Sequence, residues 1–263
     1  MKRTDRREFL KKTALSAGAL AAIPGIIGAT VKSTDAQVET EILSEVFLKK
    51  NDVIVFQGDS ITDFWRDKKD QRPNDPLGFG PGYVFLAAST LLDHFAEKHL
   101  TIYNRGISGN KVFQLADRWE KDCLELNPRL LSILIGVNDY WHMHNGKYDG
   151  TIETYENDYR ALLKRTKAAL PDVKLVIGEP FAVLGGSAVD DSWFPAFDAY
   201  RKVARKLAKE FDAIFIPYQS VFDEASKRVG PKYWTADGVH PSVAGCHLMA
   251  AAWLKSVFGM EQG

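Results

Sequence analysis

The stretch that decides the fold is Val53-Ile54-Val55-Phe56-Gln57-Gly58-Asp59-Ser60-Ile61-Thr62. Its first four residues are all apolar and mostly β-branched, which is typical of a strand buried on both faces of a parallel sheet. A serine at the exit of such a strand is exposed at the edge of the sheet, where it can act as a nucleophile if a histidine removes its proton. Alone, the same residues also fit an ordinary helix cap, so the rest of the chain must decide.

Apolar, β-rich runs alternate with helical patterns along the chain. The expected strands are 53–56, 100–104, 130–135, 173–177 and 213–217. The expected helices are 83–98, 112–126, 152–170, 194–211 and a last one that opens at Pro241, a residue tolerated in a first helical turn. This alternation predicts an α/β fold, a three-layer α/β/α sandwich around a five-stranded parallel sheet, with ligands at the carboxyl ends of the strands.

Four polar fragments follow this arrangement. Ser60 comes just after the first expected strand, Gly109 after the second, Asn138 after the third, and Asp237 with His240 just before the last helix. Carboxyl ends of parallel strands share one rim, so we expect these residues to lie together. Some of these residues are expected at this rim by chance, because loops after strands are generally rich in Gly, Asn, Asp and Ser.

Each fragment has a chemical task. His240 is the candidate base for the Ser60 hydroxyl, and Asp237 is close enough along the chain to hold the other ring nitrogen. The backbone N–H groups of Ser60 and Gly109 and the side-chain amide of Asn138 are the candidate donors to a negative oxygen formed after attack. Glycine suits position 109 because a substrate must approach the backbone there without meeting a Cβ.

Simpler interpretations exist for each residue. Asn138 with Asp139 also fits a helix cap, and His240 before Pro241 also fits a helix entry with no chemistry. Asp139, His142 and His144 suggest a metal site on paper, but a fourth ligand at convincing spacing is missing, so we expect no metal.

Four further residues are candidates for contact with a substrate: Asp59, Tyr140, Trp141 and Phe181. The three aromatic residues among them fit a pocket lining, and they fit equally well a seal over the top of the core.

Residues 1–36 look like an export signal. Arg6-Arg7-Glu8-Phe9-Leu10-Lys11 resembles the twin-arginine motif, and nineteen uncharged residues rich in Ala and Gly follow it, from Thr13 to Val31. Pro24 and the low apolar surface argue against a stable membrane anchor. We therefore expect a periplasmic or secreted protein whose single folded domain spans residues 37–263.

Composition narrows the function classes. Removing 36 residues takes away seven Lys/Arg and three Asp/Glu, so 34 − 7 = 27 positive and 34 − 3 = 31 negative groups leave a net charge of −4. This does not favour a nucleic-acid partner, which calls for a basic patch. The two cysteines, Cys123 and Cys246, are too few for a disulfide scaffold and are expected to be buried apolar residues. The oligomeric state stays open, a homo-oligomer included.

The chain resembles the SGNH (GDSL-type) hydrolases. Four blocks carry the resemblance in order: Gly58-Asp59-Ser60-Ile61, Asn104-Arg105-Gly106-Ile107-Ser108-Gly109-Asn110, Gly136-Val137-Asn138-Asp139 and Asp237-Gly238-Val239-His240-Pro241. The resemblance runs from about Asp52 to Phe258. It implies a flavodoxin-like sandwich without cofactor or metal, with Ser60, Asp237 and His240 as catalytic triad and with Gly109 and Asn138 completing the oxyanion hole.

Within that family the sequence is most similar to bacterial carbohydrate acetylesterases such as acetylxylan esterases. The similar stretches are Gly78-x-Gly80-x-Gly82-Tyr83-Val84, Arg118-Trp119 and the residues around His240. The chain departs from similar esterases at two places: at Ala236, a position where they can carry a bulky aromatic residue, and in the Gly-rich loop 184–191. The resemblance implies an acetylated carbohydrate or small ester as substrate. A short-chain lipolytic esterase or thioesterase and a catalytically silent carbohydrate-binding protein are the alternatives.

Overall fold

A five-stranded, all-parallel sheet forms the middle of the protein. The computed structural model describes residues 48–261. The strands are β1 (Val53–Gly58), β2 (Thr101–Asn104), β3 (Leu130–Leu134), β4 (Lys174–Gly178) and β5 (Ile214–Ile216), in the spatial order β2-β1-β3-β4-β5. This is the α/β/α sandwich that the alternating sequence pattern predicts, and the five strands fall where they were expected.

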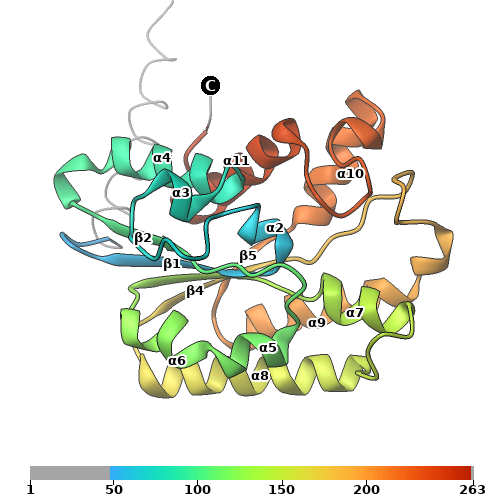
Figure 1. Ribbon diagram of the computed structural model, residues 1–263, viewed down its shortest axis with the longest axis horizontal. Helices are drawn as coiled ribbons and strands as arrows, with labels where there is room; N and C mark the ends of the chain where they lie inside the picture. Colours follow the sequence, from blue (N-terminus) through green and yellow to red (C-terminus); the bar gives the residue numbers. More distant parts are fainter. Residues whose placement is uncertain (1–47, 262–263) are drawn as a thin grey trace, which may run out of the picture. The chain divides into compact units, whose positions relative to one another are not determined.

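Helices cover both faces of the sheet (Figure 1). On one face lie α2 (Ser60–Asp63), α3 (Pro76–Phe79), α4 (Tyr83–His94), α10 (Tyr218–Arg228) and α11 (Val243–Phe258). On the other lie α5 (Val112–Asp117), α6 (Trp119–Asp122), α7 (Val137–His144), α8 (Ile152–Ala169) and α9 (Ala196–Glu210). Short 3₁₀ turns are η2 (Ala96–Lys98), η3 (Leu124–Leu126), η4 (Asp191–Trp193) and η5 (Pro231–Tyr233). None of the helices described is both long and apolar enough to cross a membrane.

The helix predictions need four corrections. The segment 83–98 is helical only to His94 and continues in the 3₁₀ turn η2. The segment 112–126 is broken into α5, α6 and η3. The last helix starts at Val243 and not at Pro241, because the Ser242 side chain accepts the Gly245 N–H and so caps the helix, while Pro241 pairs with Thr235 in an isolated β-bridge. Four helices, α2, α3, α7 and α10, were not predicted.

The strand order creates a switch point between β1 and β3. The chain leaves β1 to reach β2 on one side, and β3 lies directly on the other side of β1. Connections then diverge to opposite faces of the sheet and leave a crevice at the carboxyl ends of these two strands, where doubly wound folds bind their ligands. Ser60 follows β1 and Asn138 follows β3, so both stand at this crevice.

A glycine sets the spacing at the crevice. Gly58 pairs with Leu134 across β1 and β3. A Cβ on Gly58 would lie 2.5 Å from the Leu134 carbonyl oxygen and 2.4 Å from Thr62 Oγ1, closer than atoms can approach. The last residue of β1 therefore has to lack a side chain.

We expect Gly58→Ala to lower the free energy of unfolding by about 1–3 kcal/mol, because the added methyl group must push β1 from β3 or α2 from the sheet. Gly230→Ala is the matched control: nothing lies within 4 Å of its added Cβ and its φ is −51°, so its effect should stay within about 0.5 kcal/mol. Denaturant unfolding monitored by tryptophan fluorescence measures both. Equal stability of the two variants would contradict the steric argument.

Candidate active site

Ser60 opens α2 directly after β1. Asp59 caps this helix, since its side chain accepts the Ile61 N–H at 3.0 Å. The Ser60 hydroxyl lies 2.8 Å from Nε2 of His240, a residue 180 positions later in the chain. A serine hydroxyl and a histidine ring are therefore in direct hydrogen-bond contact at the crevice.

Asp237 holds the other side of the His240 ring. Its Oδ2 lies 2.6 Å from His240 Nδ1, and its Oδ1 accepts the backbone N–H groups of Val239 and His240 at 2.9 and 2.8 Å. The turn needs Gly238, whose φ is +95° and where a Cβ would lie 2.6 Å from the Val183 carbonyl oxygen. Both carboxylate oxygens are thus fixed, which orients the ring toward Ser60.

The two ionisable groups stabilise each other's charged form. Burial raises the pKa of Asp237, but the hydrogen bonds from His240 and from the backbone outweigh it and bring the pKa to about 2. The hydrogen bond to Asp237 raises the pKa of His240 above its usual range, against the opposing effect of burial. An imidazolium formed by proton transfer is therefore favoured here.

Asn138 and Gly109, the expected donors to a developing oxyanion, follow the carboxyl ends of β3 and β2. Asn138 lies in the first turn of α7 and is 4% exposed, and its amide Nδ2 donates one hydrogen to the Asn110 carbonyl at 3.3 Å. Its second amide hydrogen makes no other bond that the structure records. Gly109 has a φ of +82°, and no atom lies within 4 Å of a Cβ built there. Glycine is favoured at this position by the left-handed backbone and not by contact with neighbouring atoms. The space beside Gly109 is open.

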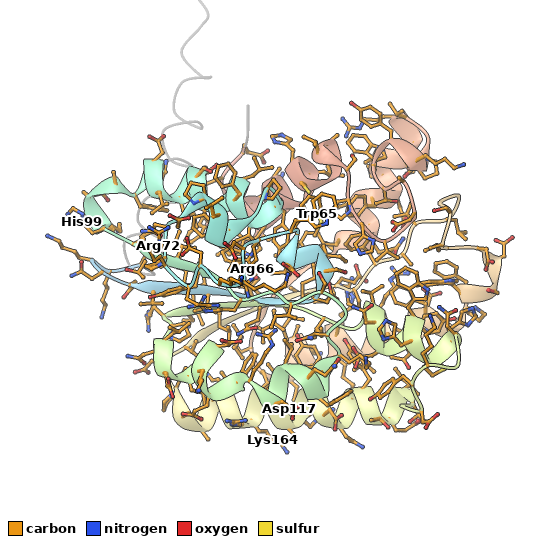
Figure 2. All side chains as sticks on the ribbon, viewed as in Figure 1. Trp65, Arg66, Arg72, His99, Asp117 and Lys164 are labelled. Carbon is orange, nitrogen blue, oxygen red and sulfur yellow. The ribbon has the colours of Figure 1, made fainter. Side chains whose placement is uncertain are left out.

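Asp63 and Arg66 fix the loop that carries Gly109, and the sequence analysis missed both. Asp63 is fully buried, and its Oδ2 accepts the N–H and the hydroxyl of Ser108, the residue before Gly109. Arg66, labelled beside α2 in Figure 2, donates its Nε to the Gly106 carbonyl at 2.8 Å. Both residues follow Ser60 within six positions, so the nucleophile segment itself holds the neighbouring loop.

Three of the four expected substrate contacts are buried. Asp59 and Phe181 are 0% exposed and Tyr140 is 1% exposed. Phe181 stacks on Phe222 at 4.4 Å, and the Tyr140 hydroxyl donates to the Trp193 carbonyl at 2.9 Å. In this arrangement they build the core beneath the site and offer no face to a substrate. Trp141 differs: it is only partly buried, and its ring lies 6.4 Å from the His240 ring.

The residues once considered for a metal point to other partners. His142 Nδ1 lies 3.1 Å from Lys111 Nζ, His144 contacts Tyr140 and Ser192, and Asp139 accepts the Val112 N–H. Within residues 48–261, no three His, Cys, Asp or Glu side chains are grouped so that they could hold a metal ion. Cys123 and Cys246 are buried free thiols, as expected.

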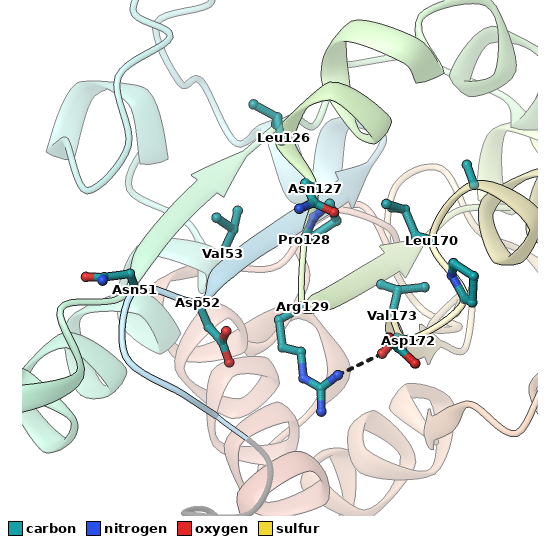
Figure 3. Close-up of a pocket in the computed structure, with 12 residues that line it drawn as sticks. Asn51, Asp52, Val53, Leu126, Asn127, Pro128, Arg129, Leu170, Asp172 and Val173 are labelled. Atoms are coloured by element: carbon teal, nitrogen blue, oxygen red, sulfur yellow. Dashed lines mark hydrogen bonds between the residues drawn. The ribbon is translucent and has the colours of Figure 1, made fainter.

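A hollow at the opposite edge of the sheet contains none of these residues (Figure 3). Its volume is about 370 Å³, and it lies where β1, β3 and β4 begin, between Asn51, Arg129 and Asp172. Arg129 Nη1 donates to the Asp172 carbonyl at 3.0 Å across it. Its lining contains no serine, cysteine, threonine or histidine, so the chemistry is expected at the carboxyl edge.

Serine hydrolases share an arrangement in which a serine hydroxyl is hydrogen-bonded to a histidine whose ring a carboxylate orients. In this protein the arrangement lies at the switch point of an α/β/α sandwich. Comparison with known proteins identifies the family. Residues 56–248 match the model of the GDSL-like lipase/acylhydrolase family, and the chain belongs to this family. It is a carboxylic ester hydrolase.

Relatives cover most of the chain. It is 34% identical over 209 residues to an acetylxylan esterase from Geobacillus stearothermophilus, covering 78% of this chain and 93% of that protein. A crystal structure of an acetylxylan esterase from the same organism superposes with a TM-score of 0.73 at 31% identity, over 82% of this chain and 97% of the other. A protein from Parabacteroides merdae described as a GDSL-like lipase is 55% identical, with a TM-score of 0.78 over 80% and 97% of the two chains.

We expect kcat/KM to fall at acid pH with an inflection above the ordinary histidine value of about 6.5. The reason is that His240 accepts a proton only when neutral, and Asp237 raises its pKa. In Asp237→Asn the inflection should move to lower pH and kcat should drop on the order of 10³–10⁴, since the amide favours the wrong tautomer. pH profiles with an aryl acetate measure both effects. The exposed control Glu224→Gln should keep the wild-type profile, and an unshifted inflection in Asp237→Asn would contradict the assignment.

Proposed function

We propose that the protein is a serine esterase that removes O-acetyl groups from carbohydrates. The observation that carries the catalytic part is the continuous set of hydrogen bonds from Ser60 through His240 to Asp237, at 2.8 and 2.6 Å. Ser60 is the nucleophile, His240 the general base and acid, and Asp237 the residue that orients the imidazole and stabilises its charged form.

The reaction runs in two halves. Ser60 Oγ attacks the acetyl carbonyl carbon while its proton passes to His240 Nε2. The tetrahedral intermediate then breaks its bond to the sugar oxygen, which takes that proton and leaves as an alcohol. Water repeats the sequence on the acetyl-enzyme, so acetate leaves and Ser60 regains its proton.

The oxyanion of each tetrahedral intermediate is stabilised by three donors: the N–H groups of Ser60 and Gly109 and the free amide hydrogen of Asn138. These donors are fixed before the substrate binds, because Asp59 caps α2, Asp63 holds the residue before Gly109 and Asn138 is tied to Asn110. Donors that need no reorganisation at the moment of reaction contribute most to catalysis.

Two indoles, one partly buried and one exposed, favour a sugar on the alcohol side. Trp141 is packed close to His240. Trp65 follows Ser60 by five residues and is 82% exposed, beside α2 in Figure 2. Its φ is +59° and that of Phe64 is +38°, a costly backbone for aromatic residues that persists where the surroundings impose it. Aromatic faces suit the apolar faces of sugar rings, and the relatives named as acetylxylan esterases point to the same substrate class.

We expect acetate esters to exceed butyrate esters by at least about tenfold in kcat/KM, and octanoate to be hydrolysed negligibly. Each methylene that does not fit a methyl-sized acyl site costs ~1–3 kcal/mol. A series of 4-nitrophenyl esters measures this, and acetate release from acetylated xylooligosaccharides tests the sugar directly. Ser60→Ala is the control and should lower kcat on the order of 10⁴ or more. Activity that rises up to octanoate would favour a lipolytic esterase instead.

Export is part of the same proposal and rests on the sequence alone, because residues 1–36 lie outside the described part of the chain. Replacing Arg6 and Arg7 by lysine should leave full-length precursor in the cytoplasm, since the twin-arginine pathway reads that pair. Cell fractionation with immunoblotting measures it. Lys2 and Arg3 replaced together serve as control, and undiminished export of the Arg6/Arg7 variant would mean that another route carries the protein.

A further inference from the structure

The Arg118 guanidinium forms hydrogen bonds to several segments around the site. Its Nε donates to the Asn110 side chain at 2.9 Å, its Nη1 to the Arg105 carbonyl at 2.7 Å, and its Nη2 reaches the Gly58 carbonyl at 3.4 Å. Nη1 also forms an ion pair with Asp122 at 2.8 Å, which further fixes the guanidinium. One planar group thus contacts the end of β1 and both ends of the loop that follows β2.

Two of these contacts, those to Gly58 and Asn110, connect Arg118 to the three proposed donors. Gly58 stands two residues before the Ser60 N–H. Asn110 stands directly after Gly109. The same Asn110 uses its backbone carbonyl to accept the amide of Asn138. We propose that Arg118 is the positioning residue of the oxyanion hole, which sets the three donors at one mutual spacing; this rests on the function proposed above.

The geometry requires arginine and not merely a positive charge. The three acceptors lie at the end of β1 and at both ends of the loop after β2. A guanidinium presents its N–H groups in one rigid plane, whereas a lysine ammonium is a single point with tetrahedral donors. The Arg118 side chain is only 16% exposed, so its donors meet little competition from water. Burial lowers its pKa, and Asp122 counteracts this, so the group keeps its charge at any pH of interest.

Arg118 acts through other residues, so its effect should appear in the chemical step and not in substrate binding. In Arg118→Lys we expect kcat for an aryl acetate to fall about 10–100-fold with KM within about twofold, because a 1 Å misplacement of catalytic groups can cost about 10²-fold. Rates are normalised to the competent enzyme by titration of Ser60 with an organophosphonate, which separates misplacement from misfolding. Arg165→Lys is the control: Arg165 also bonds a backbone carbonyl and a carboxylate, but it is 44% exposed and contacts no site residue.

A double-mutant cycle gives the sharper test. If Arg118 acts partly through Asn138, Arg118→Lys should cost at least about threefold less in kcat in an Asn138→Ala background than in the wild type. Asn110→Ala provides a milder second variant, since it removes the acceptor of the Arg118 Nε and keeps the backbone carbonyl that Asn138 uses. It should lower kcat in the same direction, again with little change in KM.

The outcomes separate this inference from the proposed function. Asn138→Ala with unchanged kcat would remove Asn138 as an oxyanion donor, and with it the role of Arg118, while the proposed function would still be tested by Ser60→Ala. Two other outcomes would overturn only the role of Arg118, provided that Asn138→Ala lowers kcat strongly. In the first, kcat of Arg118→Lys stays within twofold of wild type. In the second, the losses in kcat are fully additive in the double variant. Non-additive loss in kcat with constant KM supports it.

Discussion

The close approach of β1 to β3 at Gly58 is the constraint on which the site depends. Gly58 lies opposite Leu134 without room for a Cβ, and its carbonyl accepts the Ile107 N–H at 3.1 Å and is reached by Arg118. One residue thus brings together the ends of β1 and β3 and the loop after β2. Ser60, Asn138 and Gly109 start from these three places, so a wider sheet at this point would separate the groups that must act on one carbonyl.

The fold could be predicted from local pattern because each strand is a short, continuous apolar run, and the rule for parallel sheets then placed Ser60, Gly109 and Asn138 on one rim. Segments with mixed patterns were harder. The helix α7 follows Gly136, whose φ is +128°, and buries Asn138 and Asp139 in its first turn. From sequence alone, polar residues after a glycine indicate a loop, because the partners that allow them to be buried lie outside the segment.

The supporting residues of the site could not be predicted for a related reason. Asp63 bonds Ser108, 45 residues away, and Arg118 reaches Gly58 across 60 residues; neither contact leaves a periodic trace in sequence. Aromatic residues were misjudged because residue type does not say which way a ring faces. Tyr140 and Trp141 are adjacent on α7, yet one packs into the core and the other lies beside His240. Helical geometry turns neighbours by about 100°, so only one of them could face the site.

Electrostatics explains why two buried aspartates are tolerated beside the proposed donors. Asp59 precedes Ser60, and Asp139 follows Asn138; burial raises the pKa of each to about 7. Each ties a helix start, Asp59 through the Ile61 N–H and Asp139 through the Val112 N–H that opens α5. A fully charged carboxylate next to an oxyanion would oppose its formation, whereas a carboxylate with a pKa of about 7 is only partly charged near neutral pH, which lessens this repulsion. The site thus keeps its full negative charge at Asp237, whose pKa is about 2 and whose effect on His240 favours the reaction.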